Sequence, residues 1–224
     1  MNALRAAAAC CAAVLLLSGC VTPPGYDYTA FRQSRPRSIL VLPPVNTSTA
    51  VQASHSLMSW VTQPLAESGY YVLPVTLVEE TFRQNGLSNP AEIVDVPPAR
   101  LREIFGADAA LYIQVRQYGT VYRVIQSESV VTADARLVDL RNGAILWAGS
   151  ASASSAENRG GNSQGGLVGL LVEAVIHQII ENVSDASHDM AAVTSARLLS
   201  AGRPAGILYG PRSPRYQLDG TPAP

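Results

Sequence analysis

The stretch 130-VVTADARLVDLRNGAILWAG-149 decides the fold, because its pattern is that of two strands joined by a tight turn. Residues 130–140 form one candidate strand and residues 144–149 the next. Between them, Asn142 and Gly143 both tolerate a positive φ, which tight hairpin turns require. Asp139, beside the turn, is expected to order it rather than to carry out chemistry. The segment therefore predicts an antiparallel hairpin.

Three further strands are expected upstream of this hairpin. Leu111, Ile113 and Val115 alternate with polar or amphipathic residues, which is the period of a strand. The apolar run 39–42, which ends at two prolines, is typical of a strand buried on both faces. Residues 70–75 are expected to form another strand. Together with the hairpin, these segments predict a sheet of about five strands.

Helices are expected between the upstream strands. Residues 51–68 carry apolar side chains near helical spacing, with Pro64 expected to kink or divide the helix and Gly69 to cap it. Residues 76–85 and 99–105 are two more candidates, and Gly106 closes the second. The order of elements predicts an α/β (α+β) fold with a mixed sheet flanked by helices, in one domain over 38–203.

The C-terminal part follows a Ser/Gly-rich loop predicted at 152–166. A long helix is expected at about 167–200, with one apolar stripe along it. The stripe either packs on the sheet or, in part, meets a second copy of the chain. The tail 204–224 contains five prolines and is expected to be extended. The candidate self-association residues are Val172, Ile176, Ile179, Val183 and Met190.

The N-terminus has the pattern of a lipoprotein signal peptide at 1–19. Arg5 precedes about a dozen apolar residues, and Leu17-Ser18-Gly19-Cys20 resembles a bacterial lipobox. The run is shorter than the roughly 20 residues of a membrane-spanning helix. Cys20 is therefore the predicted lipidation site; the alternative is an ordinary signal peptide with an incidental cysteine.

A lipid on Cys20 predicts a location as well as an anchor. Val21 follows the cysteine, and the absence of aspartate there favours the outer membrane over the inner one by resemblance to lipoprotein sorting. The expected site is the periplasmic face of the outer membrane. Residues 20–37 then comprise the lipidated cysteine and a Pro/Gly-containing tether, which at about 3.5 Å per residue reaches at most about 60 Å.

Composition argues against several functions. All 16 basic residues are arginine, so the phosphate-binding lysine of a P-loop is missing. The net charge is −1 and no basic patch is evident, so nucleic acid is not an expected partner. Cys10 and Cys11 lie in the signal peptide, which leaves neither a disulfide nor a thiolate metal site.

The histidines give no catalytic or metal signature. His55, His177 and His188 lack metal-ligand spacing relative to one another. Glu173 and His177 are four residues apart and are expected to pair on a helix surface. His55 lies between two serines, but no nucleophile elbow accompanies it. The sequence predicts no catalytic residue, no metal site and no cofactor.

Several segments resemble a bacterial lipoprotein family of unknown function, typified by a genome-derived Neisseria surface-antigen candidate. They are 36-PRSILVLPP-44, 64-PLAE-67, 69-GYYV-72, 101-LREIFGADA-109 and 210-GP-211. The hairpin also resembles that of CsgG, the TolB N-terminal domain and LpoB, which implies a mixed sheet with helices against it.

These resemblances imply a lipoprotein that works through protein–protein contacts rather than as an enzyme. The expected function is an interaction module in cell-envelope assembly or secretion, and the alternative is a regulator of a peptidoglycan-synthesis enzyme. Its expected partners are the membrane, through Cys20, and other envelope proteins. A second copy of the chain is a further candidate.

Overall fold

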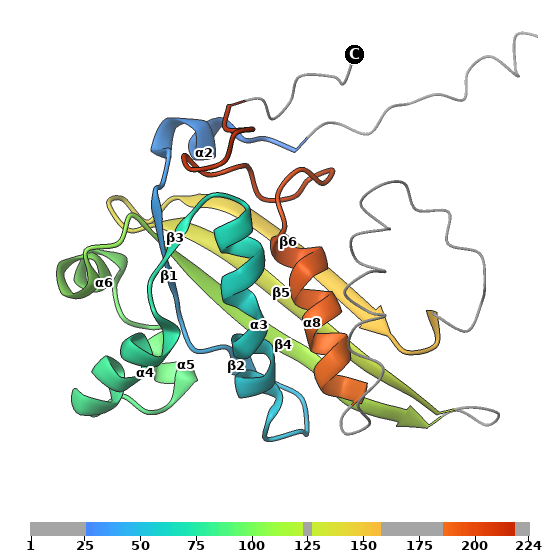
Figure 1. The fold of residues 1–224 in the computed structure, drawn as a ribbon. Helices are drawn as coiled ribbons and strands as arrows, with labels where there is room; N and C mark the ends of the chain where they lie inside the picture. The colour runs from blue at the N-terminus through green and yellow to red at the C-terminus, as the bar shows by residue number, and fades with distance from the viewer. Residues whose placement is uncertain (1–25, 123–126, 158–185, 218–224) are drawn as a thin grey trace, which may run out of the picture.

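A computed structural model of the protein describes residues 26–122, 127–157 and 186–217 (Figure 1). These residues form one mixed six-stranded sheet in the order β3-β1-β4-β5-β6, with the short β2 also beside β4. β1 is parallel to β3 and β4, whereas β4, β5 and β6 form an antiparallel meander. The strands are β1 (Ser38–Val41), β2 (Val45–Asn46), β3 (Tyr71–Val72), β4 (Ala109–Tyr122), β5 (Ser127–Asp139) and β6 (Ile145–Ser154).

Helices cover both faces of the sheet, which confirms the predicted mixed α+β class (Figure 1). α3 and α8 pack on one face, and α4, α5 and α6 pack on the other. The described helices are α2 (Thr29–Ser34), α3 (Ala53–Glu67), α4 (Val75–Gln84), α5 (Pro90–Ile93), α6 (Pro98–Phe105) and α8 (Ala186–Leu199).

β1 joins the two halves of the core. Ile39 and Val41 belong to the cluster under α3 and α8, whereas Leu40 and Leu42 belong to the cluster under α4 to α6. All four side chains are 0% exposed. A strand between two helical layers is apolar at every position, because it has no face toward water. The predicted burial of this run on both faces is confirmed.

The hairpin of β5 and β6 has the predicted antiparallel pairing, but only one of its two predicted turn residues takes a positive φ. Gly143 takes φ 74°, whereas Asn142 does not take a positive φ. Asp139 closes the turn through its backbone, accepting from the Gly143 N–H at 2.8 Å and donating to the Ala144 carbonyl at 2.9 Å. β6 continues to Ser154, so the first residues of the predicted 152–166 loop are strand.

The N-terminal segment differs from the expected tether. Residues 26–37 include α2, and Phe31 on that helix is 3% exposed. The Tyr28 hydroxyl donates to the Gly206 carbonyl at 2.5 Å, and the Tyr26 hydroxyl accepts from the Ala148 N–H at 2.8 Å. These aromatic side chains bury apolar area against the domain, which outweighs the local preference of the Pro/Gly-containing stretch for extended chain.

The described part of the C-terminal tail also belongs to the domain. Ile207 is 1% exposed, and the Leu208 carbonyl accepts from the Tyr70 hydroxyl at 2.6 Å. Gly210 donates its N–H to the Ser68 carbonyl at 2.8 Å, and a Cβ on Gly210 would lie 2.5 Å from the Gly69 carbonyl oxygen. A Schellman-type C-terminus on α3, with Gly69 at φ 97°, makes this close approach possible.

The proposed self-association stripe is corrected at the one position that the structure describes. Met190 is 6% exposed and lies on α8 in the core beneath the helix, against the sheet. Its side chain is therefore unavailable to a second copy, and Met190→Arg would disrupt the core rather than only a dimer. The other members of the stripe, Val172, Ile176, Ile179 and Val183, lie outside the described residues.

Asp139 orders the hairpin turn, as predicted. Its side chain is 2% exposed and accepts from the Arg141 backbone N–H at 2.8 Å and from the Arg141 guanidinium. The same guanidinium donates to the Ser34 carbonyl at 2.7 Å, which links the turn to α2. Burial raises the pKa of Asp139, but the hydrogen bonds to Arg141 and Ser34 outweigh burial and leave the pKa below its ordinary value.

This lowered pKa predicts a loss of stability in acid. An unfolded aspartate titrates near pH 4, so the charged form of Asp139 stabilises the fold fully above about pH 4. The contribution is lost as the pH falls from there through the lower folded pKa. We expect the melting temperature of the wild type to fall more steeply below about pH 4 than that of Asp139→Asn. Parallel curves for the two proteins would contradict this role.

Candidate functional site

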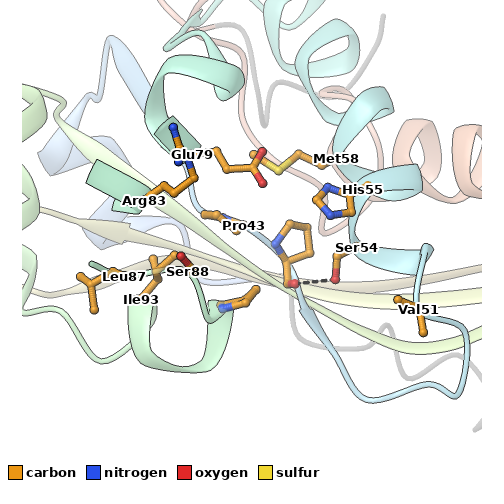
Figure 2. Close-up of a pocket in the computed structure, with 12 residues that line it drawn as sticks. Pro43, Val51, Ser54, His55, Met58, Glu79, Arg83, Leu87, Ser88 and Ile93 are labelled. Carbon is orange, nitrogen blue, oxygen red and sulfur yellow. Dashed lines mark hydrogen bonds between the residues drawn. The ribbon is translucent and has the colours of Figure 1, made fainter. Parts of the chain in front are cut away.

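A surface pocket lies between α3, α4, α5 and the chain that follows β1 (Figure 2). Its volume is about 260 Å³. Side chains from four segments that are separate in sequence meet there, which is typical of binding pockets. The lining residues are Pro43, Pro44, Val51, Ser54, His55, Met58, Glu79, Arg83, Leu87, Ser88, Pro90 and Ile93.

Local sequence signals build the walls of this pocket. Pro43 and Pro44 end β1, and the Ser54 hydroxyl donates to the Pro44 carbonyl at 2.8 Å, which ties the loop to the first turn of α3. On the opposite wall, the Asn89 side chain accepts from the Ala91 N–H at 3.0 Å and caps α5. A prolyl residue at the first position of α5 completes this helix start.

The pocket combines an apolar interior with a charged rim. Met58 and Ile93 are 6% and 2% exposed, whereas His55, Glu79 and Arg83 are exposed. Figure 2 shows His55 on α3 and the two charged residues on α4, on facing sides of the opening. A site of this kind fits an apolar side chain of a partner, with donors and acceptors of both charges around it.

The rim charges are only partly engaged within the protein. Arg83 donates to Glu80 at 2.7 and 2.8 Å, and this hydrogen bond lowers the pKa of Glu80 and raises that of Arg83. Val51, at the mouth, is 89% exposed and is the most exposed large apolar side chain among the described residues. An aliphatic side chain next to a pocket adds to the apolar area that a partner can cover.

The structure separates His55 from the two serines that flank it in sequence. The Ser54 hydroxyl bonds to the Pro44 carbonyl, and Ser56 lies on the inner side of α3. Both flanking hydroxyls are therefore bonded to groups other than His55. Among the described residues, no group of three or more His, Cys, Asp or Glu side chains could hold a metal ion.

A second polar cluster, which the sequence did not predict, joins α3, α8 and β4. The Ser56 hydroxyl lies 2.8 Å from His188 Nδ1 and accepts from the Tyr118 hydroxyl at 2.8 Å. The Trp60 indole N–H donates to His188 Nε2 at 3.1 Å. Ser56 and His188 are 132 positions apart in sequence, so no local spacing could reveal the contact.

The Ser56–His188 pair has the distance of a nucleophile and its base, but the wrong proton arrangement. His188 Nε2 accepts a hydrogen bond from Trp60, so in the neutral ring the proton sits on Nδ1. Nδ1 then donates to the Ser56 oxygen and cannot remove its proton. The cluster is therefore a partly buried polar link that positions α8 on α3.

Removing the Ser56 hydroxyl should destabilise the domain without unfolding it. Ser56→Ala would remove the hydroxyl that bonds both the Tyr118 hydroxyl and His188 Nδ1. Each lost hydrogen bond costs about 0.5–1.5 kcal/mol net, so we expect a loss of roughly 2 kcal/mol in chemical denaturation. Ser59→Ala, on the exposed side of the same helix, is the matched control and should change stability by less than about 0.5 kcal/mol. Equal effects of the two substitutions would contradict the link.

A broader hollow of about 750 Å³ lies over the part of the sheet that α4 to α6 leave uncovered. Its charged groups are engaged with one another or with aromatic rings. Arg116 and Asp134 form an ion pair, and the Arg136 guanidinium lies 4.7 Å from the centre of the Tyr112 ring. This hollow encloses a ligand less than the pocket of Figure 2 does, because its floor is an open sheet surface.

A lipobox-like sequence near the N-terminus, followed by a mixed α+β domain, is an organisation typical of bacterial lipoproteins. The family model described as "Putative lipoprotein GNA1162-like" matches residues 26–212, and the chain belongs to that family. The match begins at Tyr26 and includes α2 and most of the described tail. Among the described residues, no helix has the length and apolar character needed to cross a bilayer.

Relatives support this membership. The chain is 48% identical to the "Putative lipoprotein NMB1124/NMB1162" of Neisseria meningitidis, over 89% of this chain and 92% of that protein. It is 50% identical to the crystal structure of lipoprotein GNA1162 from Neisseria meningitidis, with a TM-score of 0.52 over 66% of this chain and all of the other. The LpoB C-terminal domain of Salmonella enterica is 18% identical, with a TM-score of 0.39 over 52% of this chain and 82% of the other. The family comparisons indicate a lipoprotein family and no enzymatic one.

Proposed function

We propose that this protein is an outer-membrane-anchored periplasmic lipoprotein that acts as a protein-interaction module in cell-envelope assembly or secretion. The observation that carries the proposal is the pocket of Figure 2, with its apolar interior, charged rim and exposed Val51. Pockets that bury one apolar side chain of a partner supply much of the binding energy at protein interfaces.

The position of the pocket relative to the lipid supports this proposal. Tyr26 is the first described residue, and the centre of its ring lies 4.8 Å from that of Tyr28, which directly precedes α2. Only residues 21–25 separate Tyr26 from Cys20, and five residues reach at most about 18 Å. The anchored end of the domain therefore lies near the membrane.

The pocket lies at the other end of α3. This helix has 15 residues and so spans about 22 Å, from Ala53 beside the pocket to Glu67 near the tail that packs against the α2 end. A short link at one end and a binding pocket at the opposite end suit a module that presents its site away from the membrane. The proposed membrane is the outer one, with the domain on its periplasmic face, because Val21 rather than aspartate follows Cys20.

The proposal predicts that a charge at the mouth of the pocket blocks partner binding. Full-length tagged protein would be purified from gently solubilised membranes after crosslinking, as wild type, Val51→Arg and Ile104→Arg. Ile104 is 46% exposed on α6, away from the pocket, and is the matched control. We expect Val51→Arg to lower recovery of specific partners at least about tenfold and the control to leave it unchanged. Equal recovery with all three proteins would contradict the proposed site.

A further inference from the structure

The outer edge of β6 is the free end of the sheet, and part of its backbone has no partner among the described residues. β6 pairs only with β5, in the register Ala133↔Ala151 and Ala135↔Gly149. From Ala148 to Ser154, beyond the register shift at Leu137/Val138, the even-numbered residues of β6 point their backbone groups away from β5. This direction follows from the Ala148 N–H, which meets the Tyr26 hydroxyl, and from the Ser152 carbonyl, which meets Arg197.

Four backbone groups remain between these two contacts. They are the Ala148 carbonyl, the Ser150 N–H, the Ser150 carbonyl and the Ser152 N–H, and none of them bonds to a described residue. An added antiparallel strand needs this set of groups for a short ladder. One residue of the added strand would exchange two backbone hydrogen bonds with Ser150. The residues two positions to either side would bond the Ala148 carbonyl and the Ser152 N–H. Exposed edges of this kind are templates for strand addition.

A groove runs along this edge, with a volume of about 360 Å³. Residues 147–152 of β6 form one side of it. The C-terminal end of α8 and residues 203–206 form the other side and leave the space open to solvent. An extended peptide beside β6 would therefore lie between the strand and a second wall that can contact its side chains.

The groove carries one positive charge that no described carboxylate neutralises. Arg197 donates to Glu157 at 2.6 and 3.1 Å and so forms an ion pair. The Arg203 guanidinium instead donates to the Arg197 carbonyl at 2.6 Å and has no carboxylate partner among the described residues. Burial lowers the pKa of Arg203, and the nearby charge of Arg197 lowers it further, so the guanidinium lies where a negative charge would be favourable.

We propose that the β6 edge groove binds an extended, acidic segment of a partner protein, which adds as a strand along Ala148–Ser152 and places a carboxylate on Arg203. Backbone hydrogen bonds supply sequence-independent affinity in this mode, and the carboxylate supplies selectivity. This inference rests on the proposed function, since it names the chemistry of a partner, but it uses a surface separate from the pocket of Figure 2.

The test uses full-length lipidated protein in detergent micelles and two fluorescent acetylated hexapeptides of alternating Thr and Val. The peptides differ only in one central residue, Glu or Gln. Binding is measured by fluorescence anisotropy. A charge-assisted hydrogen bond is worth about 1.5–3 kcal/mol, so we expect the Glu peptide to bind at least about tenfold more tightly than the Gln peptide.

Two variants separate the backbone contribution from the charge. Ser150→Pro removes an outward N–H that no described residue uses, which an edge strand tolerates, and it should weaken both peptides at least about tenfold. Ser150→Thr keeps the N–H and is the matched control. Arg203→Gln should abolish the preference for Glu while Gln-peptide binding remains. Thermal melting of each variant confirms that the fold is retained.

Three outcomes would overturn the inference. The first is no binding of either peptide at millimolar concentration, and the second is binding that Ser150→Pro leaves unchanged. The third is a wild-type dimer in light scattering that Ser150→Pro converts to monomer, because a second copy would then occupy the edge. None of these outcomes affects the Val51→Arg result, so failure of the groove and failure of the proposed function remain distinguishable.

Discussion

Val41→Asp is expected to unfold the domain or leave it barely stable. Val41 is 0% exposed and lies in β1, with strands on both sides and helices on both faces. An unpaired charge at such a site costs several kcal/mol, and a typical domain has only about 5–15 kcal/mol of stability in total. Thermal melting followed by circular dichroism measures the effect.

Leu77→Asp is the matched control for this substitution. Leu77 is 65% exposed on α4, so the same change of chemistry there meets water rather than the core. We expect its melting temperature to stay within a few degrees of the wild type, since an exposed substitution changes stability by about 0.5 kcal/mol. A Val41→Asp protein with the same melting temperature as Leu77→Asp would show that β1 is not the centre of the core.

Cys20→Ala is expected to remove the protein from the membrane or to stall its processing. In the proposed lipoprotein, acyl chains on the cysteine would supply the membrane affinity, at about 0.8 kcal/mol for each buried methylene, and two or more chains give a stable anchor. Cell fractionation with a labelled fatty acid measures both retention and modification.

Thr22→Ala, two positions after the cysteine, is the control for this prediction and should keep both the label and the membrane association. The Cys20→Ala protein should lose the label completely. Unchanged labelling and retention in the Cys20→Ala protein would end the lipoprotein interpretation of the N-terminus, whatever the domain binds.

The elements predicted best were those whose signal is local. The run 39–42 is apolar at every position because β1 has two covered faces, and that pattern alone indicated its place in the sheet. The β5–β6 hairpin followed from two candidate strands and from the turn signal between them, where Gly143 does adopt a positive φ. Gly106, at φ 66°, likewise ends α6 as expected.

The errors came from segments whose structure depends on distant contacts. Residues 26–37 resemble a linker in composition, yet Phe31 is buried as part of the core cluster under α3 and α8. Three aromatic residues within six positions, at Tyr26, Tyr28 and Phe31, were the available signal of packing. β2 was missed because two residues cannot display a period.

The candidate sites show the same limit. Pro43, His55, Glu79 and Ile93 lie on four segments, and only the tertiary fold brings them to one pocket. Met190 belongs to an apolar stripe whose spacing fits either a core or an interface. In the structure this side chain packs in the core against the sheet. The burial of a side chain depends on which other elements pack against it, and the apolar period along one helix does not contain that information.

The measurement that tests the central claim most directly is site-specific photocrosslinking in intact cells. A photoreactive amino acid would replace Ser88, an exposed residue that lines the pocket, and Ile104 on α6 as the control. The account predicts a discrete heavier product from position 88 that contains another envelope protein and disappears when Val51→Arg is added. An absence of any light-dependent product from position 88 beyond that from position 104 would contradict it.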